Sequence, residues 1–343
     1  QRQMCIRDSS YNGRNELTGA TLGTAPYGYS YDNIGNRKTA QEIAEELTYT
    51  ANNLNQYTRI EESGETPFVP TYDASGNQTL IKTSTGIWTV VYNAANRAVS
   101  FTSRDGNIVV ECGYDYQGRR YMKKVTVNGT VASHERYLYR GYLQIAALDM
   151  LNSKNVHRTL LWDPLEPVAT RPLALVQENA LYCYGMDFNK DVTEVFAGEG
   201  AVAATYDYSP YGTVTGTGNL VQPVQWSSEM NDHELALVYY NYRYYNPADG
   251  RWINRDPIAE EGGWNLYGFV GSNSILETDI LGTAWSSLQT EAGAALAARQ
   301  AAEAAAKAAA RAAGTAIAAE RSKKNKRLSL IHISEPTRRR GIS

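Results

Sequence analysis

The sequence YDNIGN at residues 31–36 is one copy of a pattern that recurs along the first third of the chain. Each copy places Asp or Asn directly after a tyrosine, and residues typical of turns follow. The intervals between copies are 20, 41, 20 and 22 residues, and the long interval holds a degenerate copy, Tyr49-Thr50-Ala51-Asn52. The regular copies are Tyr11-Asn12, Tyr31-Asp32, Tyr72-Asp73, Tyr92-Asn93 and Tyr114-Asp115.

The recurring dipeptide has a physical meaning at the end of a β-strand. Side chains alternate between the two faces of a strand, so a tyrosine on the inner face is followed by a residue that points outward. An Asp or Asn there can cap the following turn through its side chain, and a glycine such as Gly35 supplies the positive φ that the turn requires. The regular spacing favours a repeated strand-turn-strand unit over a set of unrelated hairpins.

Further hairpin signals lie between and after these copies. Asn128-Gly129 separates two alternating apolar runs, and Asp105-Gly106 does the same between residues 99–101 and 108–110. Strand-like runs continue through residues 136–208. A short hairpin buries little surface alone, so neighbouring units must stack. The sequence therefore predicts a mainly β protein in which antiparallel hairpins form one long sheet.

The composition of the 343 residues agrees with this fold class and excludes several others. Hydrophobic residues make up 43%, enough for a packed core, and 25 Tyr and 6 Trp stand against 5 Phe. Tyr and Trp suit half-buried pleated surfaces. A net charge of -3 gives no reason to expect a nucleic-acid partner. No apolar run is long enough to predict a membrane span, and three cysteines make no disulfide framework.

Both ends of the chain look foreign to the rest. Residues 1–9 and 328–343 resemble translated sequencing adapters, so we expect the natural part to be a fragment of about residues 10–327. Any signal peptide would then be unobservable. Residues 284–327 are rich in alanine and predict a helix, which is either the start of a separate C-terminal domain or a solvated linker.

A longer motif carries a family resemblance. Residues 239–258 read YYNYRYYNPADGRWINRDPI and continue with EEGGWNLYGFV at 260–270. This resembles the repeat-associated core of the rearrangement-hotspot (RHS), or YD-repeat, family of bacterial polymorphic toxins. The stretch YDYSPYG at 206–212 resembles an element just upstream of that core. The resemblance covers roughly residues 10–283.

The resemblance implies both a fold and a domain division. Hairpins in this family spiral into a hollow β-shell that the repeat-associated core closes at one end, with a variable C-terminal effector inside or beyond it. We expect the shell here to be partial. The expected divisions are YD repeats at 10–135, further strand repeats at 136–205, the core at 206–283 and the variable region from 284.

The implied function is structural. We expect a shell that carries or delivers its own C-terminal effector, is secreted or lies at the cell surface, and has secretion-system or cell-surface partners. One alternative is an autoprotease, and another is a carbohydrate-binding or adhesion module, because exposed Tyr and Trp rings stack on sugars. Tyrosines that point onto an open face would favour the last alternative.

Many family members cut themselves after the core with an arginine and two aspartates. By motif these are Arg243, Asp256 and Asp279. Two carboxylates brought close together cannot both ionise, so one could activate a water molecule while the arginine steadies the developing charge. The sequence departs from the family at the last step, where Ile280 replaces proline and Thr283 replaces leucine. Turn capping by the aspartates with an arginine ion pair is the structural alternative.

Other chemistry has weaker support. The histidines His134, His157 and His233 have no metal-site spacing, and Cys112 and Cys183 lie in strand-like runs, where a free cysteine usually packs in the core. We read Gly262-Gly263 as a turn. The sequence contains neither a nucleophile elbow nor a phosphate loop, so we expect no cofactor and no metal.

Overall fold

The computed structural model describes residues 8–43, 45–164, 171–283 and 285–287. They belong to one compact unit that spans residues 1–291. Its regular structure is antiparallel β-sheet, which confirms the predicted fold class. The helical elements in the described part are short 3-10 turns: η1 (Gly198–Gly200), η2 (Trp226–Ser228), η3 (Ala259–Gly262) and η4 (Val270–Ser272).

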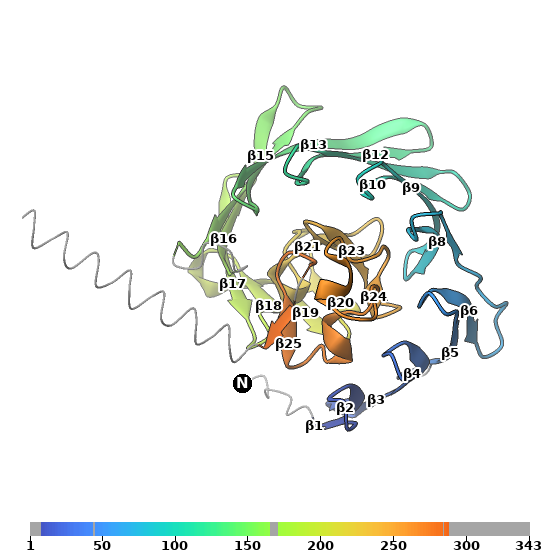
Figure 1. Cartoon of the computed structure of the whole chain (residues 1–343). Coiled ribbons are helices and arrows are strands. Elements are labelled where there is room, and N and C mark those ends of the chain that lie inside the picture. The colour runs from blue at the N-terminus through green and yellow to red at the C-terminus, as the bar shows by residue number, and fades with distance from the viewer. Residues whose placement is uncertain (1–7, 44, 165–170, 284, 288–343) are drawn as a thin grey trace, which may run out of the picture. The chain divides into compact units, whose positions relative to one another are not determined.

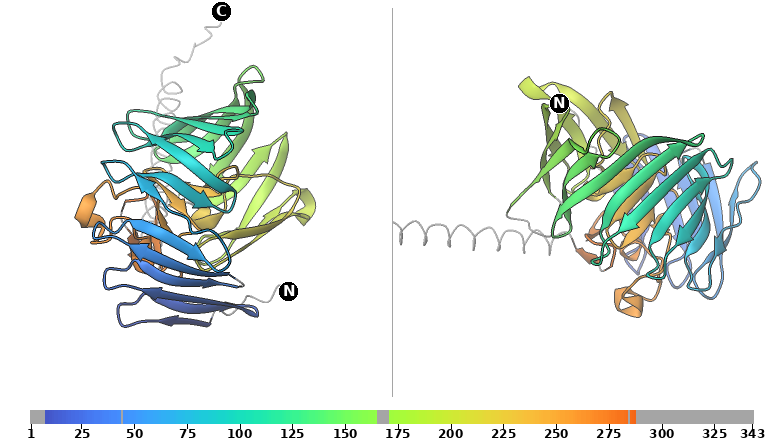
Figure 2. Two further views of the ribbon diagram at one scale, coloured as in Figure 1. Left: turned by 90° about the vertical axis from the view of Figure 1, so that its right-hand side faces the viewer. Right: turned by 90° about the horizontal axis from the view of Figure 1, so that it is seen from above.

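Two large sheets, and not the one long sheet that the sequence predicts, form a curved wall (Figures 1 and 2). Within each sheet every strand pairs with its neighbours in sequence, and the break falls between β6 and β7. The first sheet contains β1 (Asp8–Tyr11), β2 (Leu17–Leu22), β3 (Ala25–Tyr31), β4 (Arg37–Glu42), β5 (Glu45–Ala51) and β6 (Tyr57–Glu62). The second contains β7 (Thr71–Tyr72), β8 (Gln78–Thr83), β9 (Gly86–Tyr92), β10 (Ala98–Ser103), β11 (Ile108–Tyr114), β12 (Arg120–Val127), β13 (Thr130–Arg140), β14 (Leu143–Asp149), β15 (Asn155–Trp162), β16 (Pro172–Gln177), β17 (Ala180–Met186), β18 (Val192–Phe196), β19 (Val202–Tyr208) and β20 (Val214–Gly218).

The repeated Asp or Asn performs the predicted turn role. Asp32 Oδ1 accepts hydrogen bonds from the backbone N–H groups of Ile34 and Asn36, both at 2.9 Å, and Gly35 has a φ of 84°. The degenerate copy has the same turn, with Asn52 in the capping position and Ala51 in place of the tyrosine. The same pair of backbone contacts is made by Asn12, Asp73, Asn93, Asp115 and, unrecognised in the sequence, Asp187.

The repeated tyrosine connects each strand to the preceding one. Tyr114 at the end of β11 donates its hydroxyl to the carbonyl of Ala98, the first residue of β10, at 2.8 Å. The register between β11 and β12 shifts by one residue at this position, where Tyr114 pairs with Arg120 and one residue of β12 is left over as a bulge. Equivalent bonds run from Tyr31 to Leu17, Tyr92 to Gln78, Tyr139 to Arg120, Trp162 to Gln144 and Tyr208 to Val192.

The chain leaves the wall after β20 and continues along its inner face (Figure 1). We call residues 219–283 the core segment. It contains the sheet of β21 (Met230–Asp232), β22 (Leu237–Tyr240), β23 (Arg243–Asn246) and β24 (Arg251–Trp252), and the strand β25 (Glu277–Asp279), which pairs with β26 (Trp285–Ser287). Its hydrogen bonds to the wall include Asn265–Asn36, Tyr267–Gly76, Arg97–Tyr242, Arg120–Asp232 and Ser227–Asp191.

Aromatic side chains fill the space between wall and core segment. Trp252, Tyr240 and Tyr245 are each at most 1% exposed. They pack with one another and with Phe269, and the ring-centroid distances within this group are 4.0–6.3 Å. Such contacts contribute beyond the burial of their area. The tyrosine excess of the sequence thus has two sources, the repeat turns and this interior.

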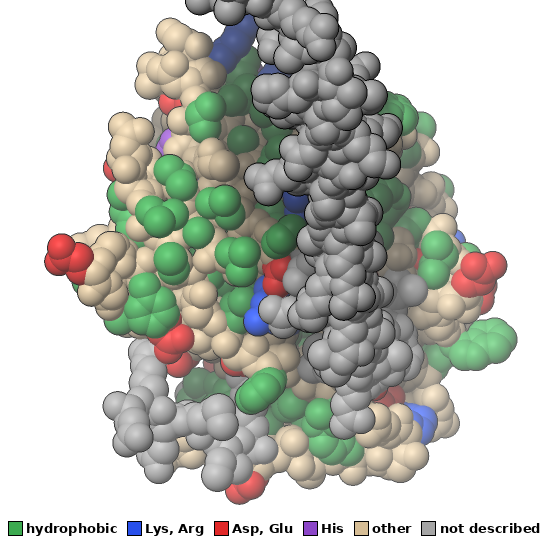
Figure 3. Space-filling model, turned by 90° about the vertical axis from the view of Figure 1, so that its left-hand side faces the viewer, with side chains coloured by type: hydrophobic (Ala, Val, Ile, Leu, Met, Phe, Trp, Pro, Cys, Tyr) green, Lys and Arg blue, Asp and Glu red, His purple; other side chains and the backbone are tan. Residues whose placement is uncertain are grey.

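The outer face of the wall is also partly apolar. The exposed fractions of Leu161, Leu173, Leu181 and Val202, on strands β15 to β19, are 44–55%, and Figure 3 shows hydrophobic side chains scattered over that side of the molecule. Cys183 lies exposed among these strands. The expectation of a core position was therefore wrong for Cys183, because apolar residues on both faces hide which face is inner. Cys112 is buried, as expected.

The start of the Ala-rich region differs from the expected helix. Residues Trp285–Ser287 form β26, which pairs with Glu277–Asp279, because the turn after Asp279 leads the chain back along β25. The remaining part of the expected helix, and the adapter-like ends except Asp8 and Ser9 in β1, lie outside the described residues.

Candidate self-cleavage site

The structure brings Arg243, Asp256 and Asp279 together at the end of the core segment. Arg243 begins β23, Asp256 follows β24, and Asp279 ends β25. Arg243 Nη2 lies 2.8 Å from Asp256 Oδ2 and 3.5 Å from Asp279 Oδ2. One guanidinium nitrogen therefore bridges the two carboxylates, and the exposed fraction of all three residues is 9% or less.

Each of the three side chains is held by further contacts. The guanidinium of Arg243 lies over the ring of Trp252, 4.1 Å from its centroid. Asp256 Oδ1 accepts the backbone N–H of Ile258 at 3.0 Å. Strand β25 fixes Asp279 in register opposite Trp285. These contacts therefore fix the positions of the three side chains relative to one another.

The turn that contains the expected cleavage point is wrapped around Asp279. Asp279 Oδ1 accepts three backbone N–H groups, from Leu281 at 3.0 Å, Gly282 at 2.7 Å and Thr283 at 3.2 Å. Arg243 Nε donates to the carbonyl of Gly282 at 2.6 Å. Both expectations for Asp279 are therefore compatible, since it caps a turn and lies against the expected cleavage point.

The two departures from the family motif leave this turn intact. Proline has no N–H to donate, and the three amides that Asp279 binds belong to residues 281–283 and not to Ile280. Thr283 contributes its backbone N–H to the same carboxylate. Neither the Ile280 nor the Thr283 side chain is therefore needed for the contacts that hold the turn.

Burial changes the charge states of the cluster. It raises the pKa of Asp279 to about 6 against the opposing attraction of Arg243, and it raises the pKa of Asp256 above its ordinary value. It also lowers the pKa of Arg243 to about 10. Desolvation is thus the main cause of the raised aspartate pKa values. From the sequence we expected repulsion between the two carboxylates to be the cause.

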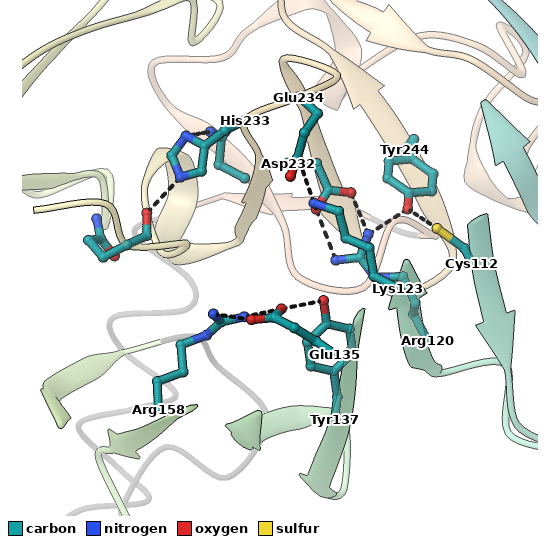
Figure 4. Close-up of polar contacts among 12 residues, drawn as sticks. Cys112, Arg120, Lys123, Glu135, Tyr137, Arg158, Asp232, His233, Glu234 and Tyr244 are labelled. Carbon is teal, nitrogen blue, oxygen red and sulfur yellow. Dashed lines mark hydrogen bonds and ion pairs between the residues drawn. The ribbon is translucent and has the colours of Figure 1, made fainter. Parts of the chain in front are cut away.

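A second buried charged cluster joins the wall to the core segment (Figure 4). Asp232 in β21 contacts Arg120 and Lys123 of β12, and Lys123 Nζ also lies 2.6 Å from Glu234. Although burial opposes ionisation, the two cations hold the pKa of Asp232 well below its usual range. Every charge in it has a partner, so we assign it a structural role.

The other candidates from the sequence do not gather into a site. His233 hydrogen-bonds to the carbonyl of Gln222, and His157 lies 3.7 Å from Glu135. In the described part of the chain no group of three His, Cys, Asp or Glu side chains could hold a metal ion. Within the same residues, no helix is long and apolar enough to cross a membrane.

Comparison with known proteins identifies the family. A model described as Teneurin YD-shell matches residues 4–275. The chain belongs to the Teneurin YD-shell family. This confirms the resemblance to the RHS or YD-repeat family that the repeats and the core motif carry.

Relatives of this YD-shell chain include much longer proteins. The tRNA3(Ser)-specific nuclease WapA of Bacillus spizizenii is 26% identical over 280 residues, which are 78% of this chain and 11% of that protein. The toxin subunit YenC2 of Yersinia entomophaga is 29% identical over 177 residues, 48% of this chain and 16% of that one. The chain thus spans about a tenth of the length of the first of these relatives.

The chain was also compared with solved structures. The crystal structure of TcdB2-TccC3 has a TM-score of 0.47 and 19% sequence identity, covering 80% of this chain and 18% of that one.

Sequence reasoning missed the glycines of the site. Gly282 has a φ of 76°, and a Cβ atom there would lie 3.0 Å from the carbonyl oxygen of Tyr240. Gly262 ends the 3-10 turn η3, in agreement with the turn prediction, but it also lies against Asp256. The family motif contains both glycines, yet their neighbours come from distant parts of the sequence.

Proposed function

We propose that this chain is part of the wall and the inner core of a shell that carries its own C-terminal effector. The observation that carries this proposal is the anchoring of the core segment. Contacts that range from the turn before β4 to the turn before β18 fix it to the inner face of the wall, and β25 pairs with β26 beyond the end of the core segment. The described part of the chain is therefore anchored to the wall as far as residue 287, and in this proposal the effector is joined to that anchored strand.

The family and the relatives support the same proposal. The matched YD-shell region is the part that this chain shares with a nuclease and a toxin subunit, each several times longer. We infer a secreted or cell-surface location and a partner in the secretion system or at the cell surface. The repeat tyrosines favour this role over a carbohydrate-binding or adhesion module, because their hydroxyls are bound to the wall backbone, as for Tyr31 and Tyr114.

Protease protection tests the enclosing role. The full chain and a synthetic peptide of residues 288–343 are treated with trypsin, and cleavage after Lys307 and Lys323 is followed by mass spectrometry. If the wall encloses this region, cleavage in the full chain should be slower by on the order of tenfold or more, since proteolysis requires opening. Equal rates in chain and peptide would exclude enclosure of these residues.

Self-cleavage is a second candidate function, which the Arg243–Asp256–Asp279 geometry specifically favours. A glycine-sized gap separates Asp256 Oδ2 from the carbonyl oxygen of Thr283, since both lie within 3.0 Å of the point where a Cβ of Gly262 would be. In the proposed reaction a protonated Asp256 donates toward that carbonyl through this gap, and the burial that raises the pKa of Asp256 favours the protonated form. The bond that follows Thr283 is therefore the one activated.

The reaction would be hydrolysis of one peptide bond. Water adds to the carbonyl carbon of Thr283 while Asp279 or a neighbouring carboxylate accepts a proton from it. The bond to the nitrogen of residue 284 then breaks, that nitrogen takes up a proton, and Thr283 becomes a carboxyl terminus. Arg243 contacts both aspartates and the Gly282 carbonyl, so it holds the turn and balances charge that develops on the carboxylates.

Mass spectrometry of the full chain tests this second function. Self-cleavage predicts a fragment ending at Thr283, which Asp256→Asn and Asp279→Asn should each abolish. Asp207→Asn is the matched control, because Asp207 is an exposed aspartate of β19 outside the cluster. A chain that stays intact at every pH from 4 to 8, or a fragment that persists in Asp256→Asn, would exclude this mechanism.

A further inference from the structure

Gly262 lies beside both the cluster and the turn that carries the expected cleavage point. A Cβ atom built on Gly262 would lie 2.4 Å from Asp256 Oδ2, 2.8 Å from its Cγ and 3.0 Å from the carbonyl oxygen of Thr283. The carboxylate and the carbonyl therefore both border the space that a side chain of this residue would occupy.

The backbone of Gly262 does not itself require glycine. Its φ lies outside the left-handed region, unlike that of Gly263, which is 127°. A side chain at residue 262 would therefore be excluded by its contacts and not by backbone strain. The contacts in question are with Asp256 and Thr283, two of the residues that the proposed reaction involves.

We infer that Gly262 is a positioning residue for the proposed self-cleavage, because its missing side chain lets the Asp256 carboxyl approach the Thr283 carbonyl. The inference rests on that proposed function. It also accounts for the bond that we propose to break: the neighbouring Gly282 carbonyl accepts a hydrogen bond from Arg243 Nε at 2.6 Å, whereas the Thr283 carbonyl and Asp256 border the same space beside Gly262.

Alanine at residue 262 should preserve the fold and disturb the chemistry. The atoms in conflict are mainly the end of the Asp256 side chain, which can rotate away at modest cost. Rotation lengthens the Asp256–Arg243 contact of 2.8 Å and moves the carboxyl away from Thr283. A displacement of about 1 Å in a catalytic group can lower a rate by on the order of 100-fold.

Two alanine variants serve as controls. In Gly268→Ala, also in the core segment, the new Cβ would meet atoms of Asn265 at 3.3–3.4 Å. In Gly198→Ala nothing lies within 4 Å. Neither position touches the cluster, so these variants report the general effect of a new methyl group on folding.

The decisive measurement is the rate of cleavage after cell-free synthesis of the full chain, from pH 4 to pH 8. We expect Gly262→Ala to cleave on the order of 100-fold more slowly and with a displaced pH midpoint, while both controls cleave as wild type does. A general loss of stability would lower the yield of folded chain without displacing the midpoint. Wild-type rate and midpoint in Gly262→Ala would overturn the inference.

A double-mutant cycle separates this inference from the self-cleavage proposal. Gly262→Ala and Asp256→Ala are combined in an Asp279→Asn background, which should not cleave, and unfolding free energies are measured. If Gly262 positions Asp256, the cost of Gly262→Ala falls when Asp256 is shortened. If Gly262→Ala costs the same unfolding free energy with and without the Asp256 side chain, the contact between residues 262 and 256 is refuted, even if the wild-type chain cleaves itself. If the two substitutions are coupled but the wild-type chain stays intact, self-cleavage is refuted and the contact is not.

Discussion

Arg120 Nη2 in strand β12 lies 3.1 Å from Asp232 Oδ1 in strand β21, and the two residues are 112 positions apart in the chain. Both side chains are 3% exposed. The pair is the centre of the charged cluster that attaches the core segment to the wall, so its loss should destabilise the whole folded unit.

Removal of one partner from this pair should be strongly destabilising. Asp232→Ala leaves Arg120 and Lys123 buried with much of their countercharge gone, so we expect the free energy of unfolding to fall by about 3–5 kcal/mol. Denaturant unfolding followed by tryptophan fluorescence measures it. Glu61→Ala breaks a surface pair with Arg59, with side chains 44% and 49% exposed, and should cost about 0–1 kcal/mol. Similar losses in free energy of unfolding in both variants would show that burial does not make the Arg120–Asp232 pair more important for stability than a surface pair.

The turn contacts of the repeats should each make a measurable contribution. Asn93 Oδ1 accepts the backbone N–H groups of Ala95 and Arg97, both at 3.0 Å. Asn93→Ala removes both bonds and should lower the free energy of unfolding by about 1–2 kcal/mol. Asn93→Asp keeps the acceptor, as Asp73 does in its own repeat, and should be nearly neutral. An equal loss in the two variants would show that the capping oxygen is unimportant.

Two tyrosines near the end of β11 form a natural pair for testing the hydroxyl bonds. Tyr114→Phe removes the donor to the Ala98 carbonyl, so we expect a loss of about 0.5–1.5 kcal/mol in the free energy of unfolding. Tyr116 is 91% exposed, and Tyr116→Phe should have no measurable effect. Thermal unfolding of both variants checks this, and an unchanged melting temperature for Tyr114→Phe would contradict it.

Stability should decrease as pH rises from about 4 to about 6. Burial raises the pKa of Asp249 to about 6, so the folded chain binds a proton that the unfolded chain has already released in this range. The penalty is complete above pH 6 and absent below pH 4. A rise of about two units in the pKa corresponds to a loss of about 3 kcal/mol in the free energy of unfolding. Asn246 donates to Asp249 Oδ2 at 3.0 Å in the folded chain.

The variant Asp249→Asn tests that pH dependence. Its stability relative to wild type should be greater at pH 8 than at pH 4, because asparagine has no charge to bury. Urea unfolding at the two pH values measures the difference. The same difference at both pH values would mean that Asp249 does not titrate in this range. Asp279 has a similarly raised pKa, so part of the wild-type pH dependence should persist in the variant.

Local features of the fold could be predicted from the sequence, and long-range ones could not. The Asn128-Gly129 hairpin and the repeated turns depend on neighbouring residues, and all are present as expected. The strand partners of Asp279 depend on where the chain turns back, which spacing does not reveal. The expected helix therefore gave way to β26 in its first residues.

The candidate site was accessible through the family motif alone. Nothing in the spacing of Arg243, Asp256 and Asp279 indicates that one guanidinium reaches both carboxylates. The part played by Gly262 depends on an atom that glycine lacks, so no pattern of residue types could have pointed to it. Cys183 shows the opposite limit, since apolar neighbours on both faces of a strand conceal which one is inner.

Within each wall sheet, the pairing of every strand with its sequence neighbours sets an order of assembly. Each hairpin from β1 to β20 can form as soon as its own residues have left the ribosome, because its partners precede it directly. The core segment is synthesised later and must close contacts as distant as Gly35 with Ser272. We therefore expect docking of the core segment to be the slow step of folding, with the apolar inner wall open to chaperones until it is complete.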